Sequence, residues 1–434
     1  MDDTAGHAHL SRRTFLRTIS GAAGLLAAAP LLGASAGAAA HSAPGSTLLT
    51  GRALRVGVLL AQPPSYPEIG ANFLAGMQLY LAQHGGQAGM RAVELLVRES
   101  GVLPDRALTE MRALLEPAQA DLLVGMMRSG IASSLHPAME AQQVPLIVGG
   151  AGANLTRQAD GRAYIFRNTL GAWRGSWALG NWAARNLGST ALIATSFYDS
   201  GYDANYLFEL GFEGAGGTVI GTRVSHRPTD RPGHLGALMR AIQQAQPTVV
   251  FAGYAGQAAT EFVRAYATAG LHGRIPLLGA GFLADERHLQ ELGEAAVGIR
   301  TALPWAPSLD TSANRDFKQA FRASTGRPAD AFAVLGYDTA QLIAAASRVT
   351  GGDSGALRQA LASAAFAGPR GPVAMDSYAL DVSTPLYLRE VQGTGGHLHN
   401  AVVGELFAPP QLDARFQAVR ATTKTDWQNA YLCV

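Results

Sequence analysis

The residues best placed for chemistry lie where two apolar segments end. Residues 121–127 read as a buried strand that leads into Arg128-Ser129-Gly130, and residues 144–148 read as another that leads into Gly149-Gly-Ala-Gly152. Ser129 is well placed to begin a helix, and the free N–H groups and dipole at a helix start attract anions. Small residues at 149–152 let backbone N–H groups approach a ligand closely. This pattern indicates an anion-binding site. The alternative is a capped helix followed by an ordinary turn.

The sequence carries no motif typical of a catalytic centre. Its Gly-x-Ser-x-Gly match, at residues 33–37, lies in a Gly/Ala-rich N-terminal stretch rather than between a strand and a helix, and it has no His-Glu-x-x-His pair, phosphate-binding loop or Cys-x-x-Cys. His397 and His399 would share one strand face, but two histidines without a third ligand make a weak metal site. We therefore expect a binding protein rather than an enzyme, with no cofactor and no metal.

Alternating strands and helices must position these residues. The segment 54–60 reads as a buried strand, and apolar residues then recur at helical spacing over 69–81. The alternation continues to residue 148, restarts near Trp173 and runs to residue 302. Three helical stretches and two strand-like pieces follow, at 314–325, 330–349, 354–365, 372–375 and 386–391. This order predicts an α/β fold of two units, each with a parallel sheet flanked by helices.

Composition excludes several classes of partner. The chain has 434 residues, 48% of them hydrophobic, with 34 Lys and Arg against 32 Asp and Glu. A nearly balanced charge gives no electrostatic reason for a nucleic-acid partner or an anionic membrane surface. Its one cysteine, Cys433, excludes an internal disulfide. The length suits two domains rather than one.

The N-terminal residues have the order of a secretory signal. Arg12 and Arg13 precede a mild apolar segment over 19–32, and Ala38-Ala39-Ala40 follows before His41. The paired arginines and the Gly/Ala-rich core resemble a twin-arginine signal, so we expect residues 1–40 to direct folded export to the periplasm. An ordinary N-terminal helix is the alternative. The apolar segment is shorter than the roughly 20 residues of a spanning helix, which disfavours a membrane anchor.

Several segments, in this order, resemble the leucine/isoleucine/valine-binding family of periplasmic solute-binding proteins, which serve ABC importers. They lie at 54–60, 70–80, 144–156, 165–168, 198–202, 212–217, 317–321, 336–342, 366–373 and 386–391. The resemblance covers residues 50–405. It implies two lobes with a ligand in the cleft between them, joined by three crossovers near Thr169, Leu303 and Arg370.

The resemblance also gives the expected domain bounds. Lobe 1 comprises 52–169 plus 303–370, and lobe 2 comprises 170–302 plus 371–408. Residues 409–434, whose patterning is weak, form a C-terminal extension.

The resemblance assigns roles to single residues. It implies that Ser129, Ala151 and Gly152 hold the carboxylate of the ligand. Tyr202 and Tyr254 in the second lobe match aromatic positions of the cleft. In addition, we expect Tyr66 in the first loop and Trp305 in a crossover region to contact the ligand. Each of these aromatic side chains offers an apolar face with a polar tip. Packing or surface positions are the alternative for each of them.

One departure from the family bears on the ligand. Amino-acid-binding members of the family present a carboxylate to the ammonium group of the ligand, and Gly281, followed by Phe282, aligns with that position. A buried cation without a partner is costly. We therefore expect a carboxylate ligand with an apolar or aromatic body that packs against Phe282. A branched-chain amino acid is the alternative, if Asp203 or Asp285 meets its ammonium group.

The expected function is capture of a small organic ligand for an ABC importer. The partners would be that ligand and the permease subunits of the inner membrane, and the protein would act as a monomer. A sensory ligand-binding subunit that docks on a receptor or regulator would use the same fold, because fold does not fix function.

Overall fold

The computed structural model describes residues 52–61, 68–126, 129–150, 163–196, 202–226, 231–350, 354–377 and 379–408. The predicted signal at 1–40 and the predicted extension at 409–434, with Cys433, lie outside these residues. So do Tyr66, Ala151 and Gly152. For Ser129 and Tyr202 the backbone is described and the side chain is not.

The first sheet of the described residues has nine strands. They are β1 (Leu54–Leu60), β2 (Gln87–Ala88), β3 (Arg91–Glu99), β4 (Leu122–Met126), β5 (Leu146–Gly149), β6 (Ile165–Arg167), β12 (Ala365–Gly368), β13 (Gly371–Asp376) and β14 (Asp381–Ser383), in the order β12-β13-β14-β6-β5-β4-β1-β3-β2. The central strands β3, β1, β4, β5 and β6 are parallel, as the buried Leu- and Val-rich segments predict. The two ends of the sheet are antiparallel, at β2 and at the β12–β13–β14 meander.

The second sheet has seven strands. They are β7 (Thr190–Ser196), β8 (Thr218–Ser225), β9 (Val249–Gly253), β10 (Leu277–Gly279), β11 (Arg300–Leu303), β15 (Leu386–Thr394) and β16 (His397–Leu406), in the order β16-β15-β11-β10-β9-β7-β8. Strands β8, β7, β9, β10 and β11 are parallel, and the β15–β16 hairpin adds an antiparallel edge. The two predicted α/β units are therefore confirmed, each with antiparallel strands at its margin.

Helices connect most of the parallel strands. They are α2 (Ile69–Gln83), α3 (Pro104–Leu115), α4 (Ser129–Gln142), α5 (Ala172–Asn186), α6 (Tyr202–Gly214), α7 (His234–Ala245), α8 (Gly256–Thr268), α9 (Glu286–Leu292), the short 3-10 helix η2 (Gly293–Ala296), α10 (Ser312–Thr325), α11 (Ala331–Thr350) and α12 (Ser354–Leu361). Local sequence sets several of their starts. Pro104 begins α3, where a missing N–H costs nothing. Thr311 caps α10 by accepting the N–H of Asn314 at 3.1 Å.

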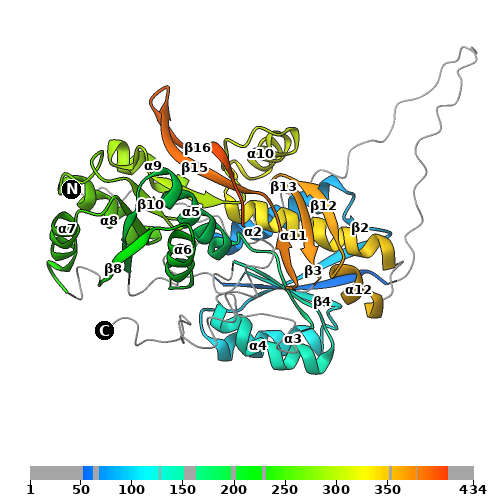
Figure 1. Cartoon of the computed structure of the whole chain (residues 1–434). Coiled ribbons are helices and arrows are strands. Elements are labelled where there is room, and N and C mark those ends of the chain that lie inside the picture. Colours follow the sequence, from blue (N-terminus) through cyan, green and yellow to red (C-terminus); the bar gives the residue numbers. More distant parts are fainter. Residues whose placement is uncertain are drawn as a thin grey trace, which may run out of the picture. The chain divides into compact units, whose positions relative to one another are not determined.

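The longest helix, α11, packs against α2 through two glycines. A Cβ atom on Gly336 would overlap the carbonyl oxygen of Phe73, and one on Gly76 would overlap that of Ala333. The two backbones therefore approach more closely than any larger residue would allow. Figure 1 shows α11 (yellow) crossing α2 and lying beside β12 and β13. This pair of helices belongs to the apolar core over one face of the nine-stranded sheet.

Within the described residues the chain passes between the two sheets three times. The first passage follows β6 and the second follows β11, close to the predicted crossovers at Thr169 and Leu303. The third was predicted near Arg370, and this position is wrong. Strands β13 and β14 continue the nine-stranded sheet, so the third passage is the two-residue link Thr384-Pro385. The predicted lobe 2 segment 371–408 is thus divided between the two sheets.

Candidate functional site

The predicted anion-binding segments lie at one edge of the nine-stranded sheet. Strands β4 and β5 are adjacent and end level, with Met126 opposite Gly149 in the parallel register. Helix α4 begins at Ser129, three residues after β4. The carboxyl ends of parallel strands, followed by helix starts, form the edge where open α/β sheets bind ligands. The roles of Ser129, Ala151 and Gly152 in holding a carboxylate stay predictions.

The predicted aromatic residues follow three adjacent strands of the seven-stranded sheet. Strands β7, β9 and β10 are neighbours that run in parallel. Tyr202 is the first residue of α6, which follows β7, and Tyr254 comes directly after β9. Phe282 lies three residues after the end of β10. The structure therefore places all three residues after the carboxyl ends of adjacent strands.

Tyr254 is held firmly at this edge. Its side chain is 3% exposed and stacks on Phe262, with ring centroids 4.4 Å apart. Its hydroxyl lies 2.8 Å from the Oγ of Ser225, at the end of β8. Contact between Tyr254 and a ligand stays a prediction.

One buried polar side chain beside Tyr254 was not predicted from the sequence. Asn205 of α6 is 7% exposed, and neither atom of its amide has a hydrogen-bond partner. It packs so closely over Gly253, the last residue of β9, that a Cβ atom there would collide with its amide oxygen. An asparagine one turn into a helix that follows a strand was the available signal.

A buried arginine organises the turn after β10. Arg389 of β15 is 1% exposed, and its Nη2 donates to the carbonyl oxygen of Gly281 at 2.6 Å and to the Oγ1 of Thr301 at 2.9 Å. Its Nη1 lies 3.3 Å from the Oε1 of Glu286. Burial raises the pKa of Glu286, although the charge of Arg389 opposes that rise. The sequence signal available for this arginine was its place directly after the apolar residues 386–388 of a predicted strand.

No acidic side chain stands within residues 280–284 of this turn, and the acids that follow it are already engaged. Asp285 caps α9 by accepting the N–H of Arg287 at 3.1 Å, and its other carboxylate oxygen lies 2.5 Å from the guanidinium of the same residue. Glu286 accepts from Asn400 at 2.9 Å as well as from Arg389. Neither carboxylate is free to meet a ligand ammonium in this arrangement.

Phe282 stacks on a ring of the other α/β unit. Its ring centroid lies 5.3 Å from that of Phe332, in the first turn of α11, with 6° between the ring planes. The side chain is partly buried against the core over the nine-stranded sheet. Phe282 thus lies where the two units touch.

Trp305 occupies a core position. The side chain is fully buried, and its indole N–H donates to the Oδ1 of Asn314 at 2.7 Å. Its backbone carbonyl accepts from Arg389 at 3.4 Å. The core residues around Trp305 exclude solvent in this structure. Contact between Trp305 and a ligand stays a prediction.

None of the helices in the described residues combines the length and hydrophobicity needed to cross a membrane. Histidine, cysteine and acidic side chains in those residues form no group of three or more suited to a metal ion.

Comparison with known proteins identifies the class. The model of the periplasmic binding protein family matches residues 53–396, and the chain belongs to this family. The predicted resemblance to periplasmic solute-binding proteins is thereby confirmed. Such proteins are the solute-binding components of ABC transporters.

Three relatives illustrate the likeness. The Leu/Ile/Val-binding protein homolog 6 of Brucella melitensis is 29% identical over 350 residues, which cover 78% of this chain and 87% of the relative. An ABC transporter substrate-binding protein from Sphaerobacter thermophilus is 28% identical, with a TM-score of 0.77 over 82% of this chain and 98% of that chain. A solute-binding protein of an ABC transporter from Rhodopseudomonas palustris, solved with benzoate, is 30% identical, with a TM-score of 0.71 over the same shares.

Proposed function

We propose that the chain captures a carboxylate with an apolar or aromatic body for an ABC importer. The observation that carries this proposal is the turn after β10. Its residues 280–284 are all uncharged, and the carbonyl of Gly281 is bound by the buried Arg389. An ammonium group at this turn would find no carboxylate and would lie near a buried guanidinium.

An uncharged ligand body suits the same surroundings. Phe282 and Tyr254 follow adjacent strands near the edge of the sheet, and the ring of Phe282 is only partly buried. Burying apolar area contributes about 25 cal/mol per Å². The carboxylate of the ligand would meet the start of α4 and the small residues after β5, where backbone N–H groups attract anions. The relative solved with benzoate supports this class of ligand.

Branched-chain amino acids are the second candidate. The name of the Brucella relative favours them. Such a ligand needs a carboxylate for its ammonium group, from Asp203 or Asp285. The side chain of Asp203 lies outside the described part of the structure, and Asp285 would have to leave both the helix cap and Arg287. The loss of the helix cap and of the ion pair with Arg287 makes an amino acid the weaker candidate.

The N-terminal residues bear on where the protein acts. Arg12 and Arg13, ahead of a Gly/Ala-rich apolar segment, support export through the twin-arginine route to the periplasm. There the protein would act as a monomer that delivers its ligand to permease subunits.

Isothermal titration calorimetry tests the ligand class. We expect benzoate to bind more tightly than leucine, valine or phenylalanine. Ser129→Ala should weaken benzoate binding, whereas the control Ser134→Ala should not. Ser134 lies in the same helix, and its hydroxyl donates to the carbonyl of Ile131 at 2.7 Å. Tight binding of leucine that is lost in Ser129→Ala would overturn the proposal in favour of the amino acid.

A further inference from the structure

A hollow of about 370 Å³ lies beside the Thr384-Pro385 link, and its lining includes none of the predicted ligand-binding residues that the structure describes. Its size is within the range of small-molecule sites. It is formed by the start of α5, the β13–β14 meander, the link itself and the end of β16. The two sheets therefore both contribute to its wall.

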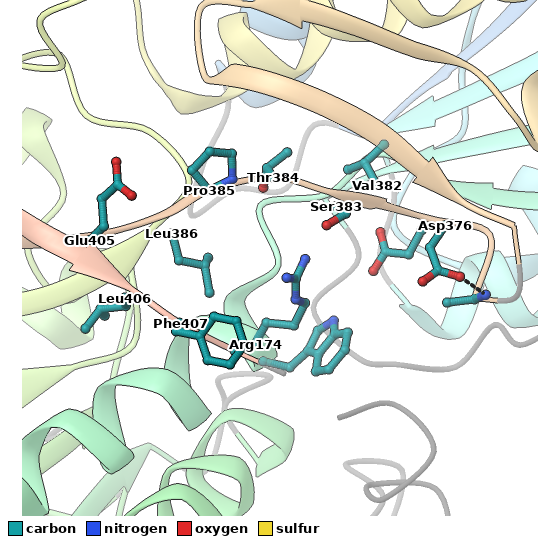
Figure 2. A pocket seen from close by; sticks show the side chains of 14 residues that line it. Arg174, Asp376, Val382, Ser383, Thr384, Pro385, Leu386, Glu405, Leu406 and Phe407 are labelled. Carbon is teal, nitrogen blue, oxygen red and sulfur yellow. Dashed lines mark hydrogen bonds between the residues drawn. The ribbon is translucent and has the colours of Figure 1, made fainter. Parts of the chain in front are cut away.

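The charges around this hollow are unbalanced. Three carboxylates line it, from Asp376, Asp381 and Glu405, together with the guanidinium of Arg174. Asp381 is also paired with the buried Arg167, which leaves one negative charge in excess. Figure 2 shows Arg174 extending from α5 into the hollow, with Asp376 on the opposite side in this view. The excess of negative charge favours a cation.

One of these carboxylates, that of Asp381, has an oxygen atom without a hydrogen-bond partner. The side chain of Asp381 is 6% exposed, and its Oδ2 lies 3.2 Å from the Nη2 of Arg167. Its Oδ1 has no hydrogen-bond partner. A buried carboxylate oxygen without a donor is costly, so a donor supplied from outside would be stabilising. Burial raises the pKa of Asp381, although Arg167, Arg174 and Arg370 oppose that rise, and a bound cation would oppose it further.

The remaining wall is apolar. Pro385, Leu386 and Leu406 line the hollow, and Phe407 at its rim is 76% exposed. Figure 2 shows these side chains on the β15–β16 side of the hollow. A short hydrocarbon chain would cover this surface and gain the free energy of apolar burial.

We propose that this hollow is a second binding site, which takes a small organic cation: a primary ammonium or guanidinium group directed at Asp381 and Asp376, on a short apolar body that packs against Leu386, Leu406 and Phe407. The site is independent of the ligand that binds at the strand ends.

Calorimetry with n-butylamine and n-butylguanidine tests the site, with butan-1-ol and butyrate as probes of the same length. We expect saturable binding of the two cations at one site per chain. Neither butan-1-ol nor butyrate should bind comparably, because the first lacks the charge and the second carries the wrong sign. Butan-1-ol binding as tight as that of butylamine would show that only the apolar surface contributes, and would overturn the proposal. A lack of saturable binding of both cations would also overturn it.

Two variants that change the charge of the hollow in opposite directions make the test more specific. Asp376→Asn should weaken butylamine binding about fivefold or more, since a charge-assisted contact is lost. The oxygen of the asparagine can still accept the N–H of Ala379, which lies 2.9 Å from the carboxylate, so folding should persist. Arg174→Gln should instead tighten butylamine binding at least about threefold, because it removes the competing positive charge.

The matched control is Glu294→Gln, at an exposed residue of the short 3-10 helix η2. It changes the net charge as Asp376→Asn does, but it lies outside the hollow, so butylamine affinity should not change. Weaker butylamine binding in Arg174→Gln would overturn the proposal by showing that the site prefers anions. Equal weakening in Glu294→Gln and Asp376→Asn would overturn it by showing a general charge effect.

Discussion

Arg370 and Asp338 form an ion pair in which neither side chain is exposed, with the Nε and Oδ2 atoms 2.5 Å apart. The same guanidinium donates to the carbonyl oxygen of Thr169 at 3.0 Å and to the Oδ1 of Asn168 at 2.6 Å. The carbonyl of Arg370 accepts from the hydroxyl of Tyr387 at 3.1 Å. The side chain and backbone carbonyl of this one residue thus link α11, the first passage between the sheets and the strand after the third passage.

Replacing Arg370 with Met should be strongly destabilising. Asp338 would remain buried without its partner, and such losses cost about 3–5 kcal/mol of unfolding free energy. Urea denaturation measures the effect. The exposed pair Arg264–Glu291 provides the control, because Arg264→Met should change stability by only about 0.5 kcal/mol. The double variant Arg370→Met with Asp338→Leu should recover much of the loss. A double variant less stable than Arg370→Met alone would contradict this account.

Gly336→Ala should separate α11 from α2. The new Cβ would overlap the carbonyl oxygen of Phe73, and relieving the overlap requires a backbone shift that costs about 1–3 kcal/mol or more. The control is Gly214→Ala in α6, where a Cβ meets no atom within 4 Å. That variant should be neutral or slightly stabilising, because alanine favours helix. Thermal unfolding of the two variants decides the matter, and equal melting temperatures would refute the close approach.

Phe282 and Phe332 should be energetically coupled. Their parallel rings, with centroids 5.3 Å apart, predict an interaction of about 0.5–1.5 kcal/mol beyond their separate burial. A double-mutant cycle with Phe282→Ala and Phe332→Ala measures it by urea denaturation. Strict additivity of the two single effects would show that the stack contributes nothing.

An acid at position 281 should not convert the protein to amino-acid binding in one step. A Cβ on Gly281 would overlap the buried side chain of Leu303, so Gly281→Ala should lose about 1–3 kcal/mol and Gly281→Asp more. Denaturation measures the loss, and calorimetry with leucine measures binding. A Gly281→Asp variant that is as stable as the parent and binds leucine tightly would prove this prediction wrong.

Replacing Arg12 and Arg13 with Lys should leave uncleaved protein in the cytoplasm, because the twin-arginine route reads the arginine pair. Immunoblots of cytoplasmic and periplasmic fractions measure the distribution. Normal export of the variant would instead indicate the general secretory route.

The sequence predicted the regular elements well where they are long and apolar. The strand expected at 54–60 is β1 with the same bounds, and the helix expected at 314–325 is α10, which begins two residues earlier. The sheet that receives β13 and β14 was not predictable in this way, because it depends on pairing with β6 far earlier in the chain. Short strands carry little pattern of their own.

The candidate site was predictable only in part. Ser129, Tyr202, Tyr254 and Phe282 stand at strand ends, and strand ends are visible in the sequence. The contacts of Arg389 and Arg370 were not visible, because most of them join residues separated by about a hundred positions or more. Such pairings follow from tertiary packing, which local patterns do not encode.

The pairing of β14 with β6 has a consequence for how the protein is made. Asp381 lies opposite Arg167 in this ladder, so the nine-stranded sheet cannot be complete until nearly the whole described chain has left the ribosome. Contacts so distant in sequence are slow to form, and they leave the edge of β6 exposed during synthesis. Until residues 381–383 arrive, that edge is a strand surface open to chaperones and to mispairing.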